Sequence, residues 1–228
     1  MNTGRFVIFT GLWPEEAELA ALPEVKADDY VVCADAGYIV CKSAGIRPEA
    51  VIGDFDSLSG GLISEIGSLG IEGFVHPREK DDTDTMLCAK HGIERGFERY
   101  LIIGGIGGDF GHTMANLQTL SFLTDMKCEA EIITDRERLV MADGETLNVV
   151  LGPKPAVPVN ISGSVGARFS AFSYTERSSG VTIKNAKYEL DDAVLTHSYP
   201  IGVSNEFVNA EPVTISVRFG RLLVIANR

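Results

Sequence analysis

The sequence predicts an α/β protein: an N-terminal doubly wound, mostly parallel sheet domain followed by a C-terminal all-β sandwich domain. Up to about residue 135, short apolar runs alternate with helical patterns, which is typical of a parallel sheet covered by helices. Beyond that point, apolar runs are separated by Gly, Pro, Asn and Asp, without a convincing helix, as in an antiparallel sandwich. No repeat or low-complexity linker intervenes, so we expect domains at 1–135 and 136–228.

The elements of the N-terminal part have clear local signals. Helices are expected at Tyr38–Ala44, which Gly45 follows, at Thr83–Arg95, which Gly96 follows, and at His112–Leu123. Glycine directly after a helical pattern is a stop signal. Strands are expected where Val, Ile, Phe and Tyr gather before turn residues, namely at Phe6–Phe9, Tyr30–Ala34, Val51–Gly53, Gly73–His76 and Tyr100–Ile103.

The C-terminal part, about 90 residues long, has the size and spacing of a small sandwich. Its apolar runs are bounded by turn-forming residues, which favours antiparallel strands. The expected strands are Leu139–Ala142, Leu147–Leu151, Val159–Ser162, Arg168–Tyr174, Val181–Tyr188 and Val213–Ile225.

Composition narrows the class of protein. The 228 residues are 45% hydrophobic and 23% charged, as in an ordinary globular chain. The net charge of −12 argues against a nucleic-acid partner, which needs a basic face. No apolar run approaches the roughly 18 residues of a membrane span. The four cysteines form no C-x-x-C pair, which favours free thiols and a cytoplasmic location over a disulfide or metal framework.

Acidic residues follow successive strands of the predicted parallel sheet. Ligands of such sheets bind beyond the carboxyl ends of the strands. A single Asp in this position is often a turn former or a helix N-cap, and Asp82 and Thr83 are good cap candidates for the next helix. Several acidic clusters at neighbouring strand ends instead indicate a common site, formed by Asp35, Asp54, Asp56, Asp81, Asp82, Asp84 and Asp109.

A divalent metal would explain this concentration of charge. In an extended segment Asp54 and Asp56 would point to the same face. Two carboxylates about 4 Å apart repel by roughly 1 kcal/mol in water and by several-fold more in a cleft. Mg²⁺ prefers oxygen ligands and is often shared between carboxylates and substrate phosphates. The sequence therefore predicts a site for a metal–nucleotide complex.

The glycine-rich segment 104–108 joins a predicted strand to a helix. Glycines there let backbone N–H groups approach a phosphate at the helix N-terminus. The segment matches neither the dinucleotide-binding fingerprint nor the P-loop, and a tight strand-to-helix turn is the alternative. His112 either binds phosphate or only begins the helix.

Six segments stand out together along the chain: ADAG (34–37), GIRPEAVIGDFDSL (45–58), KDDTD (80–84), GGIGGDFGHTMANLQTL (104–120), GVTIKNAKYEL (180–190) and GVSNEF (202–207). These motifs, in this order, resemble bacterial thiamine pyrophosphokinases over nearly the whole chain. The resemblance implies ATP as cosubstrate, Mg²⁺ as cofactor, AMP as leaving product, and a homodimer that binds thiamine at the subunit interface.

The resemblance also assigns residues. Ser204 and Asn205 would contact thiamine, with a polar hairpin turn as the alternative for both. The metal ligands would be Asp54, Asp56 and Asp84, and either Asp84 or Asp35 would accept the proton of the thiamine hydroxyl. Together with the argument from the residues, the resemblance predicts the catalytic set Asp35, Asp54, Asp56, Asp84 and Asp109, in which Asp109 does not match the family pattern, and the phosphate-binding set Asp81, Thr83, Gly107, Gly108 and His112.

One segment departs from the family pattern. The family usually reads G-G-R-x-D-H where this chain has GGDFGH at 107–112, so Asp109 stands for the Arg and Gly111 for the Asp. We hypothesise that Asp109 replaces the missing carboxylate because Gly111 frees the turn, and that Lys80 or Arg78 replaces the lost positive charge. Two other functions remain open: a pyrophosphokinase for another small alcohol, and a non-catalytic sensor of thiamine or thiamine diphosphate.

Overall fold

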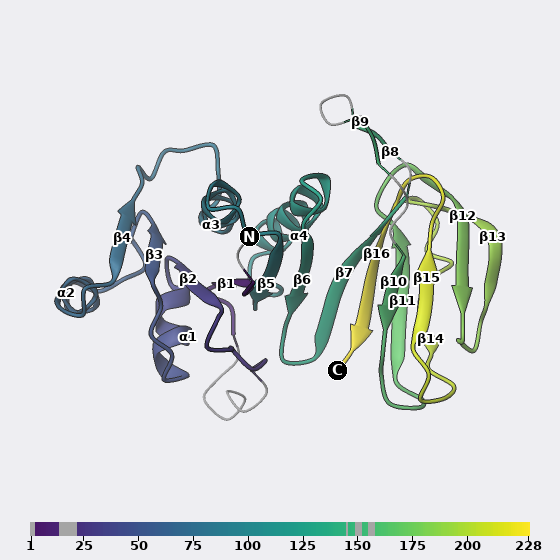
Figure 1. Ribbon diagram of the computed structural model, residues 1–228, viewed down its shortest axis with the longest axis horizontal. Helices are drawn as coiled ribbons and strands as arrows, with labels where there is room; N and C mark the ends of the chain where they lie inside the picture. Colours follow the sequence, from purple (N-terminus) through teal and green to yellow (C-terminus); the bar gives the residue numbers. More distant parts are fainter. Residues whose placement is uncertain (1–2, 14–21, 145, 149–151, 155–157) are drawn as a thin grey trace. The chain divides into compact units, whose positions relative to one another are not determined.

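The structure, a computed structural model, describes residues 3–13, 22–144, 146–148, 152–154 and 158–228 (Figure 1). The chain divides into two compact units, Met1–Asp135 and Arg136–Arg228. Each unit has its own hydrophobic core. None of the helices in the described ranges combines the length and the hydropathy needed to cross a membrane.

The first unit is built on a parallel sheet in the order β6-β5-β1-β2-β3-β4. The order reverses at β1, because β2, β3 and β4 follow on one side while β5 and β6 lie on the other. Because every neighbouring pair is parallel, all the strands present their carboxyl ends at one edge of the sheet. Their bounds are β1 (Phe6–Phe9), β2 (Tyr30–Ala34), β3 (Ala50–Gly53), β4 (Glu72–Val75), β5 (Arg99–Ile103) and β6 (Glu129–Ile133).

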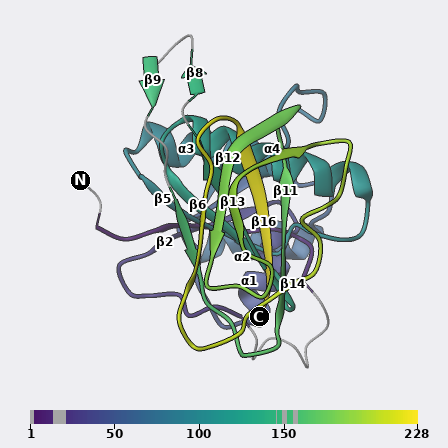
Figure 2. The same ribbon diagram turned by 90° about the vertical axis from the view of Figure 1, so that its right-hand side faces the viewer.

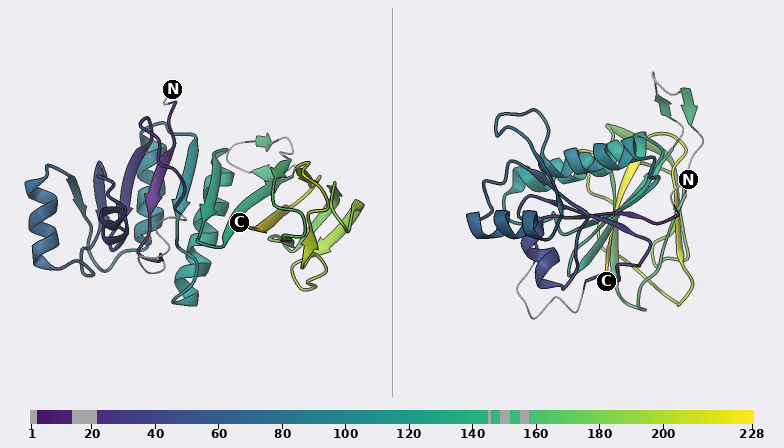
Figure 3. Two further views of the ribbon diagram at one scale, coloured as in Figure 1. Left: turned by 90° about the horizontal axis from the view of Figure 1, so that it is seen from below. Right: turned by 60° about the vertical axis from the view of Figure 1, so that its left-hand side comes forward.

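Helices cover both faces of this sheet, as Figures 1 and 3 show. On one face Tyr38 of α1 and Ile66 of α2 are buried in a cluster with Phe9. On the other face α3 packs so closely that a Cβ on Gly92 would lie 2.9 Å from Cγ of Phe6. This doubly wound arrangement confirms the predicted fold class of the N-terminal part. The helices are α1 (Gly37–Ser43), α2 (Gly60–Ser68), α3 (Asp84–Glu94) and α4 (Phe110–Asp125).

Two elements of the first unit were not expected from the sequence. Helix α2 contains three glycines, which disfavour a helix, but the Ser59 hydroxyl accepts from the Leu62 N–H at its start and Ile66 is buried. Strand β6 reads Glu-Ala-Glu-Ile-Ile and lacks a long apolar run. Pairing with β5 and burial of Ile132 and Ile133 place it in the sheet.

The second unit contains two antiparallel sheets that share one core (Figure 2). The first has the order β14-β11-β16-β7, and the second has the order β10-β15-β12-β13. Inward side chains such as Phe169, Val224, Val181 and Ile215 come from both sheets, which is the predicted sandwich. The strands are β7 (Glu137–Asp143), β10 (Val159–Ile161), β11 (Arg168–Ser173), β12 (Arg177–Lys184), β13 (Leu190–Thr196), β14 (Asn205–Glu206), β15 (Val213–Ser216) and β16 (Arg221–Asn227), beside a hairpin of β8 (Thr146–Asn148) and β9 (Gly152–Lys154).

Two strand predictions in this unit need correction. The single strand expected at Val213–Ile225 is wrong, because β15 ends at Ser216 and β16 begins at Arg221. Gly220, with φ 91°, lies in the turn between them. The run at Val181–Tyr188 ends earlier, at Lys184, and β13 was missed. Of the strand expected at Leu147–Leu151, residues 149–151 lie outside the described residues.

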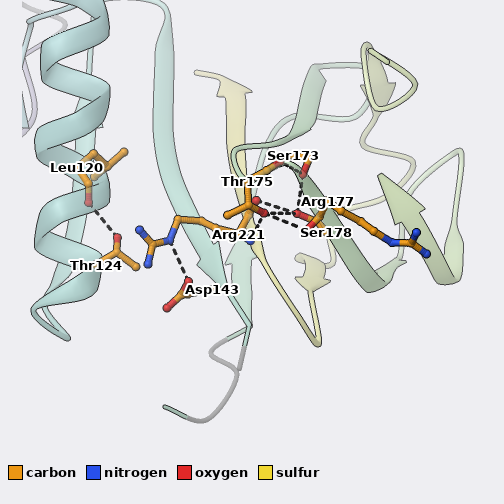
Figure 4. Close-up of polar contacts among 8 residues, drawn as sticks. All are labelled: Leu120, Thr124, Asp143, Ser173, Thr175, Arg177, Ser178 and Arg221. Atoms are coloured by element: carbon orange, nitrogen blue, oxygen red, sulfur yellow. Dashed lines mark hydrogen bonds and ion pairs between the residues drawn. The ribbon is translucent and has the colours of Figure 1, made fainter. Parts of the chain in front are cut away.

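Buried polar side chains join the two sheets of the sandwich (Figure 4). The Ser178 hydroxyl on β12 donates to the Arg221 carbonyl on β16 (2.9 Å) and lies 2.7 Å from the Ser173 hydroxyl on β11. Arg221 Nε donates to Asp143 Oδ1 at 2.9 Å. Each of these groups is buried and hydrogen-bonded, so none carries the full cost of lost hydration.

Candidate active site

Three carboxylates meet at the carboxyl edge of the parallel sheet. Asp35 follows β2, Asp54 follows β3, and Asp84 begins α3. One carboxylate oxygen from each lies within 4.8 Å of the others. Asp35 is buried, and the other two are half-buried. We call these residues the acidic trio; in the described parts of the chain it is the one such group of three potential metal ligands.

The backbone around Gly53 makes this convergence possible. Asp35 has φ 40°, a left-handed conformation, and its N–H donates to the Ile52 carbonyl (3.0 Å) across the β2–β3 pair. A Cβ on Gly53 would lie 2.9 Å from Cβ of Asp35 and 3.2 Å from Cγ of Asp84. Glycine at position 53 therefore leaves the space in which the carboxylates of Asp35 and Asp84 approach each other.

The acidic trio carries more negative charge than its neighbours neutralise. Lys80 Nζ lies 3.1 Å from Asp84 Oδ1 and 3.9 Å from Asp54 Oδ2. Three carboxylates (−3) and one ammonium (+1) leave a formal charge of −2. Asp35 Oδ1 is buried and has no hydrogen-bond partner among the described residues. Burial raises the pKa of Asp84; Lys80 opposes this, and the charges of Asp35 and Asp54 add to it.

These features fit a divalent cation. All the candidate ligand atoms are carboxylate oxygens, which hard cations such as Mg²⁺ prefer. The excess charge of −2 and the unpartnered oxygen of Asp35 are both unfavourable unless a cation offsets them. The arrangement can therefore hold a metal together with a polyphosphate.

Asp56 is not part of the trio. The expectation that Asp54 and Asp56 share one face of an extended segment is wrong, because Phe55 between them has φ 62° and its ring is buried. The exposed carboxylate of Asp56 lies 3.4 Å from Arg78, while its N–H donates to Asp54 Oδ1 at 3.1 Å. The third member of the trio is Asp35, which is not among the metal ligands predicted from the sequence.

Residues 81–83 lead into α3, whose first residue, Asp84, belongs to the acidic trio. Thr83 is the N-cap residue, and its Oγ1 accepts from the Met86 N–H at 3.2 Å. This confirms the capping alternative for Thr83, although the hydroxyl keeps a proton that it can donate. Asp82 pairs with Lys90 (2.6 Å). Asp81 is exposed.

The glycine loop (residues 104–108) has a conformation that few other residues adopt. Gly104, Gly105, Gly107 and Gly108 have φ of 81°, 83°, 108° and 60°, in the left-handed region where a Cβ is disfavoured. The loop leads directly into the N-terminus of α4. Thr113 Oγ1 accepts from the Gly107 N–H at 3.0 Å. The loop is therefore a tight strand-to-helix turn beside a helix N-terminus, the setting in which phosphates bind.

Asp109 is the N-cap of α4, outside the acidic trio. Its Oδ1 accepts from the His112 N–H at 3.1 Å, and both residues are exposed. Gly111 lies in the first turn of the helix, where a Cβ would be 2.9 Å from this same Oδ1. Gly111 thus makes room for the cap, and its place in the first helical turn does not support the expectation that it frees the turn. Replacement of the missing family carboxylate by Asp109 stays a hypothesis.

The two predicted thiamine contacts lie in the second unit. Ser204 is exposed with φ 59°. Asn205 is buried, and its side chain pairs with both backbone groups of Tyr188: Oδ1 accepts from the N–H (3.0 Å) and Nδ2 donates to the carbonyl (2.8 Å). Oδ1 also accepts from the Glu206 N–H (2.9 Å). Asn205 therefore fixes the segment that carries Tyr188, whose ring is exposed.

Sequence comparison identifies both parts of the chain. A family model described as the catalytic domain of thiamin pyrophosphokinase matches residues 23–133, and one described as its vitamin B1 binding domain matches residues 160–222. The chain belongs to the thiamine pyrophosphokinase family. The residues that match the catalytic-domain model lie in the first unit, and those that match the vitamin B1 binding model lie in the second unit. Membership of this family confirms the function predicted from the sequence, that of an ATP-dependent diphosphotransferase.

Known members of the family are similar over most of their length. Thiamine pyrophosphokinase from Bacillus subtilis is 25% identical over 192 residues, which are 84% of this chain and 84% of that protein. The crystal structure of the Bacillus subtilis enzyme superimposes with a TM-score of 0.80, at 21% identity and 98% coverage of both chains. A thiamin pyrophosphokinase family protein from Enterococcus faecalis gives 0.78, at 24% identity and 99% coverage of both. These structures share the fold of this chain.

Proposed function

We propose that this chain transfers the pyrophosphoryl group of ATP to the hydroxyl of thiamine, with Mg²⁺ held by the acidic trio. The observation that carries this proposal is the excess charge of −2 on Asp35, Asp54, Asp84 and Lys80 at the carboxyl edge of the catalytic unit. When bound, Mg²⁺ neutralises charge on the phosphoryl oxygens. The trio gives it an all-oxygen donor set with a buried acceptor, Asp35 Oδ1, that has no partner in the described part of the chain.

The chain's own groups position the reactants. The hydroxyl oxygen of thiamine attacks the β-phosphorus of ATP in line, a new O–P bond forms, and the bond to the α-phosphate oxygen breaks to release AMP. A carboxylate of the trio, Asp84 or Asp35, receives the hydroxyl proton. Such transfers depend mainly on positioning and charge neutralisation, to which Lys80 contributes its ammonium.

We assign the phosphates of ATP to the glycine loop and to the N-terminal ends of α3 and α4. Backbone N–H groups at Gly108 and in the first turn of α4 favour an anion, and His112 stands exposed beside them. Thr83 can donate its hydroxyl proton to a phosphate oxygen. Asp81 lies three residues before Asp84, in the segment that leads into α3. Asp56 remains a candidate ligand, because a bound polyphosphate brings its own oxygens and cation to this edge.

Thiamine is assigned to the second unit, at Ser204 and Asn205. An exposed apolar stretch there, Tyr199, Ile201 and Val203, is 67%, 62% and 48% accessible. Contiguous exposed apolar residues often mark an interaction surface. We propose that it forms the homodimer and the walls of the thiamine site. The free state of all four cysteines supports a cytoplasmic location.

A direct assay tests this function. The protein is incubated with thiamine, ATP and Mg²⁺, and thiamine diphosphate and AMP are measured by chromatography. Equal amounts of both products are expected, with none in EDTA. Saturable thiamine binding without AMP release would establish a sensor instead, and AMP formed only with another alcohol would change the acceptor.

Point variants then test the metal assignment. Asp54→Asn is expected to abolish most turnover, and Asp82→Asn is the matched control, because Asp82 pairs with Lys90 outside the trio. Comparable losses in the two variants would argue against the acidic trio as the metal site.

A further inference from the structure

We propose that Arg78 binds the phosphate chain of the nucleotide, and that Asp56 holds the Arg78 guanidinium beside the site until the nucleotide arrives. This inference rests on the proposed function, since it names a further phosphate-binding residue for that reaction. It also decides between Lys80 and Arg78, the two residues expected from the sequence to replace the positive charge that the family has at position 109.

The segment that carries Arg78 is anchored at the site on both sides. Arg78 lies in the connection from β4 to α3, the long loop at the upper left of Figure 1. Two residues earlier, the His76 N–H donates to the carbonyl of Gly53 (2.8 Å), which lies between two strand ends of the acidic trio. Two residues later, Lys80 Nζ lies 3.1 Å from Asp84 Oδ1. The Arg78 side chain therefore starts from backbone that is held beside the trio.

The guanidinium of Arg78 is available to an incoming anion, whereas the ammonium of Lys80 is not. Arg78 lies 3.4 Å from Asp56 Oδ2, and the two side chains are 81% and 45% exposed. An ion pair as exposed as this one contributes little stability, so a polyphosphate with several charges can displace Asp56. Lys80 is only 15% exposed and already lies beside two carboxylates of the trio.

The charge at this edge of the sheet favours the same assignment. The connections that follow β2, β3, β4 and β5 contain two Arg or Lys side chains, Arg78 and Lys80. The trio and Lys80 have a formal charge of −2, which one Mg²⁺ brings to zero, so together they offer a triphosphate no net positive charge. Arg78 is the other cation of these connections, and a guanidinium binds two phosphate oxygens at once.

Asp56 connects Arg78 to the acidic trio. Its N–H donates to Asp54 Oδ1 (3.1 Å), while its carboxylate lies outside the trio, beside Arg78. When a phosphate takes the guanidinium, the carboxylate of Asp56 loses its partner and becomes available to the cation that arrives with the phosphates. This exchange of partners links phosphate binding to Asp56, the residue next in sequence but one to the trio member Asp54.

Equilibrium binding tests the contact without turnover. Inorganic tripolyphosphate is titrated into the protein in excess Mg²⁺ and followed by calorimetry. Arg78→Gln is expected to weaken binding about tenfold, near the lower end of the range for hydrogen bonds to charged groups because the side chain is exposed. Arg78→Lys keeps the charge without the paired geometry and should lie between. Arg99→Gln is the matched control, because Arg99 is exposed at the first residue of β5, away from the carboxyl end; unchanged affinity in Arg78→Gln would overturn the proposal.

A second comparison separates contact with the phosphates from neutralisation of Asp56. If Arg78 only neutralised Asp56, its removal would have no effect in a protein that lacks this carboxylate. Tripolyphosphate is therefore titrated into Asp56→Asn and into the double variant Asp56→Asn/Arg78→Gln. We expect weaker binding in the double variant, since the guanidinium itself holds the phosphates. Equal affinity of these two proteins would overturn the proposal, and equal Tm values would show that both are folded.

Kinetics distinguish this proposal from the proposed function. Arg78→Gln should raise KM for ATP about tenfold and leave KM for thiamine unchanged. Normal turnover with unchanged KM for ATP in Arg78→Gln would reject the role of Arg78 and leave the proposed function intact. Loss of tripolyphosphate affinity in Arg78→Gln, when the wild-type protein forms no thiamine diphosphate, would reject the proposed function and support the role of Arg78.

Discussion

Gly53→Ala tests whether the space between the carboxylates controls activity. The added Cβ would lie 2.9 Å from Asp35 Cβ, 3.2 Å from Asp84 Cγ and 3.3 Å from Asp84 Oδ1. Carbon atoms in contact are ordinarily about 3.5–4.0 Å apart. Asp35 therefore has to move by about 0.6–1.1 Å relative to β3 before the methyl group fits.

The expected effects follow from that displacement. Overpacking of this kind costs about 1–3 kcal/mol of stability, which leaves most small domains folded. Misplacement of a catalytic group by about 1 Å lowers turnover by about 10²-fold. We therefore expect a folded Gly53→Ala protein with a large loss of kcat and a raised Mg²⁺ concentration at half-maximal rate.

The assay is AMP formation from thiamine and ATP over a series of Mg²⁺ concentrations, together with thermal unfolding. Gly73→Ala is the matched control, because Gly73 lies in the next strand and a Cβ there would meet only the Phe55 ring at an ordinary 3.6 Å. Gly53→Ala with native kcat and native Mg²⁺ dependence would refute the role given to this space.

Three further predictions concern charges in the first unit. Asp54→Asn should lower turnover, measured as AMP release, by at least about 10²-fold, and Asp56→Asn should lower it by less. An equal or greater loss in Asp56→Asn would indicate that Asp56 is a metal ligand. Lys80→Met should lower the Tm in EDTA by a few degrees, since roughly 1 kcal/mol corresponds to about 2–4 °C in a domain of this size class, and Mg²⁺ should restore part of it; an unchanged Tm would mean that Lys80 does not offset the repulsion. Burial alone would raise the pKa of Asp29, but the hydrogen bonds from Arg5 and from the Lys26 N–H, together with the charge of Arg5, lower it. Asp29 therefore contributes stability above its unfolded pKa of about 3.9, and this is lost as the pH falls through the folded value. Asp29→Asn should thus cost about 2 kcal/mol at pH 7 in denaturant unfolding and progressively less below about pH 4; a cost independent of pH would exclude the ion pair as its source.

Local signals explain the part of the fold that could be predicted. Gly45 and Gly96 follow α1 and α3 with φ of 71° and 76°, a conformation that glycine adopts without cost. Thr83 caps α3, as its position before a helical pattern indicates. Strands β1 and β2 and residues 100–103 of β5 are unbroken runs of apolar and aromatic residues, so they stand out in the sequence.

Nonlocal packing explains the elements that were missed. Glycines in α2 and glutamates in β6 contradict local propensity, and burial against the rest of the sheet outweighs it. The two-residue spacing of Asp54 and Asp56 was interpreted as an extended segment, but burial of the Phe55 ring reverses the backbone there. Asp35 joins the trio because β2 pairs with β3, a contact that no spacing along the chain encodes.

From the sequence alone, core or surface packing is the more natural interpretation of Trp13, the single tryptophan of the chain. It does contact the core of the first unit, yet it also lines a pocket at the carboxyl ends of β1, β5 and β6. An isolated aromatic residue carries no motif, so the sequence could not place it beside β5 and β6.

Lys80 gives the acidic trio a counter-charge that is covalently part of the protein. Its ammonium offsets some of the repulsion whether or not a cation is present, so the carboxylates can remain close together between catalytic cycles. The remaining formal charge of −2 is the amount that one divalent cation, with its charge of +2, would neutralise. If the proposed Mg²⁺ binds there, this arrangement would let it arrive and depart with each nucleotide, without being needed to hold the fold together.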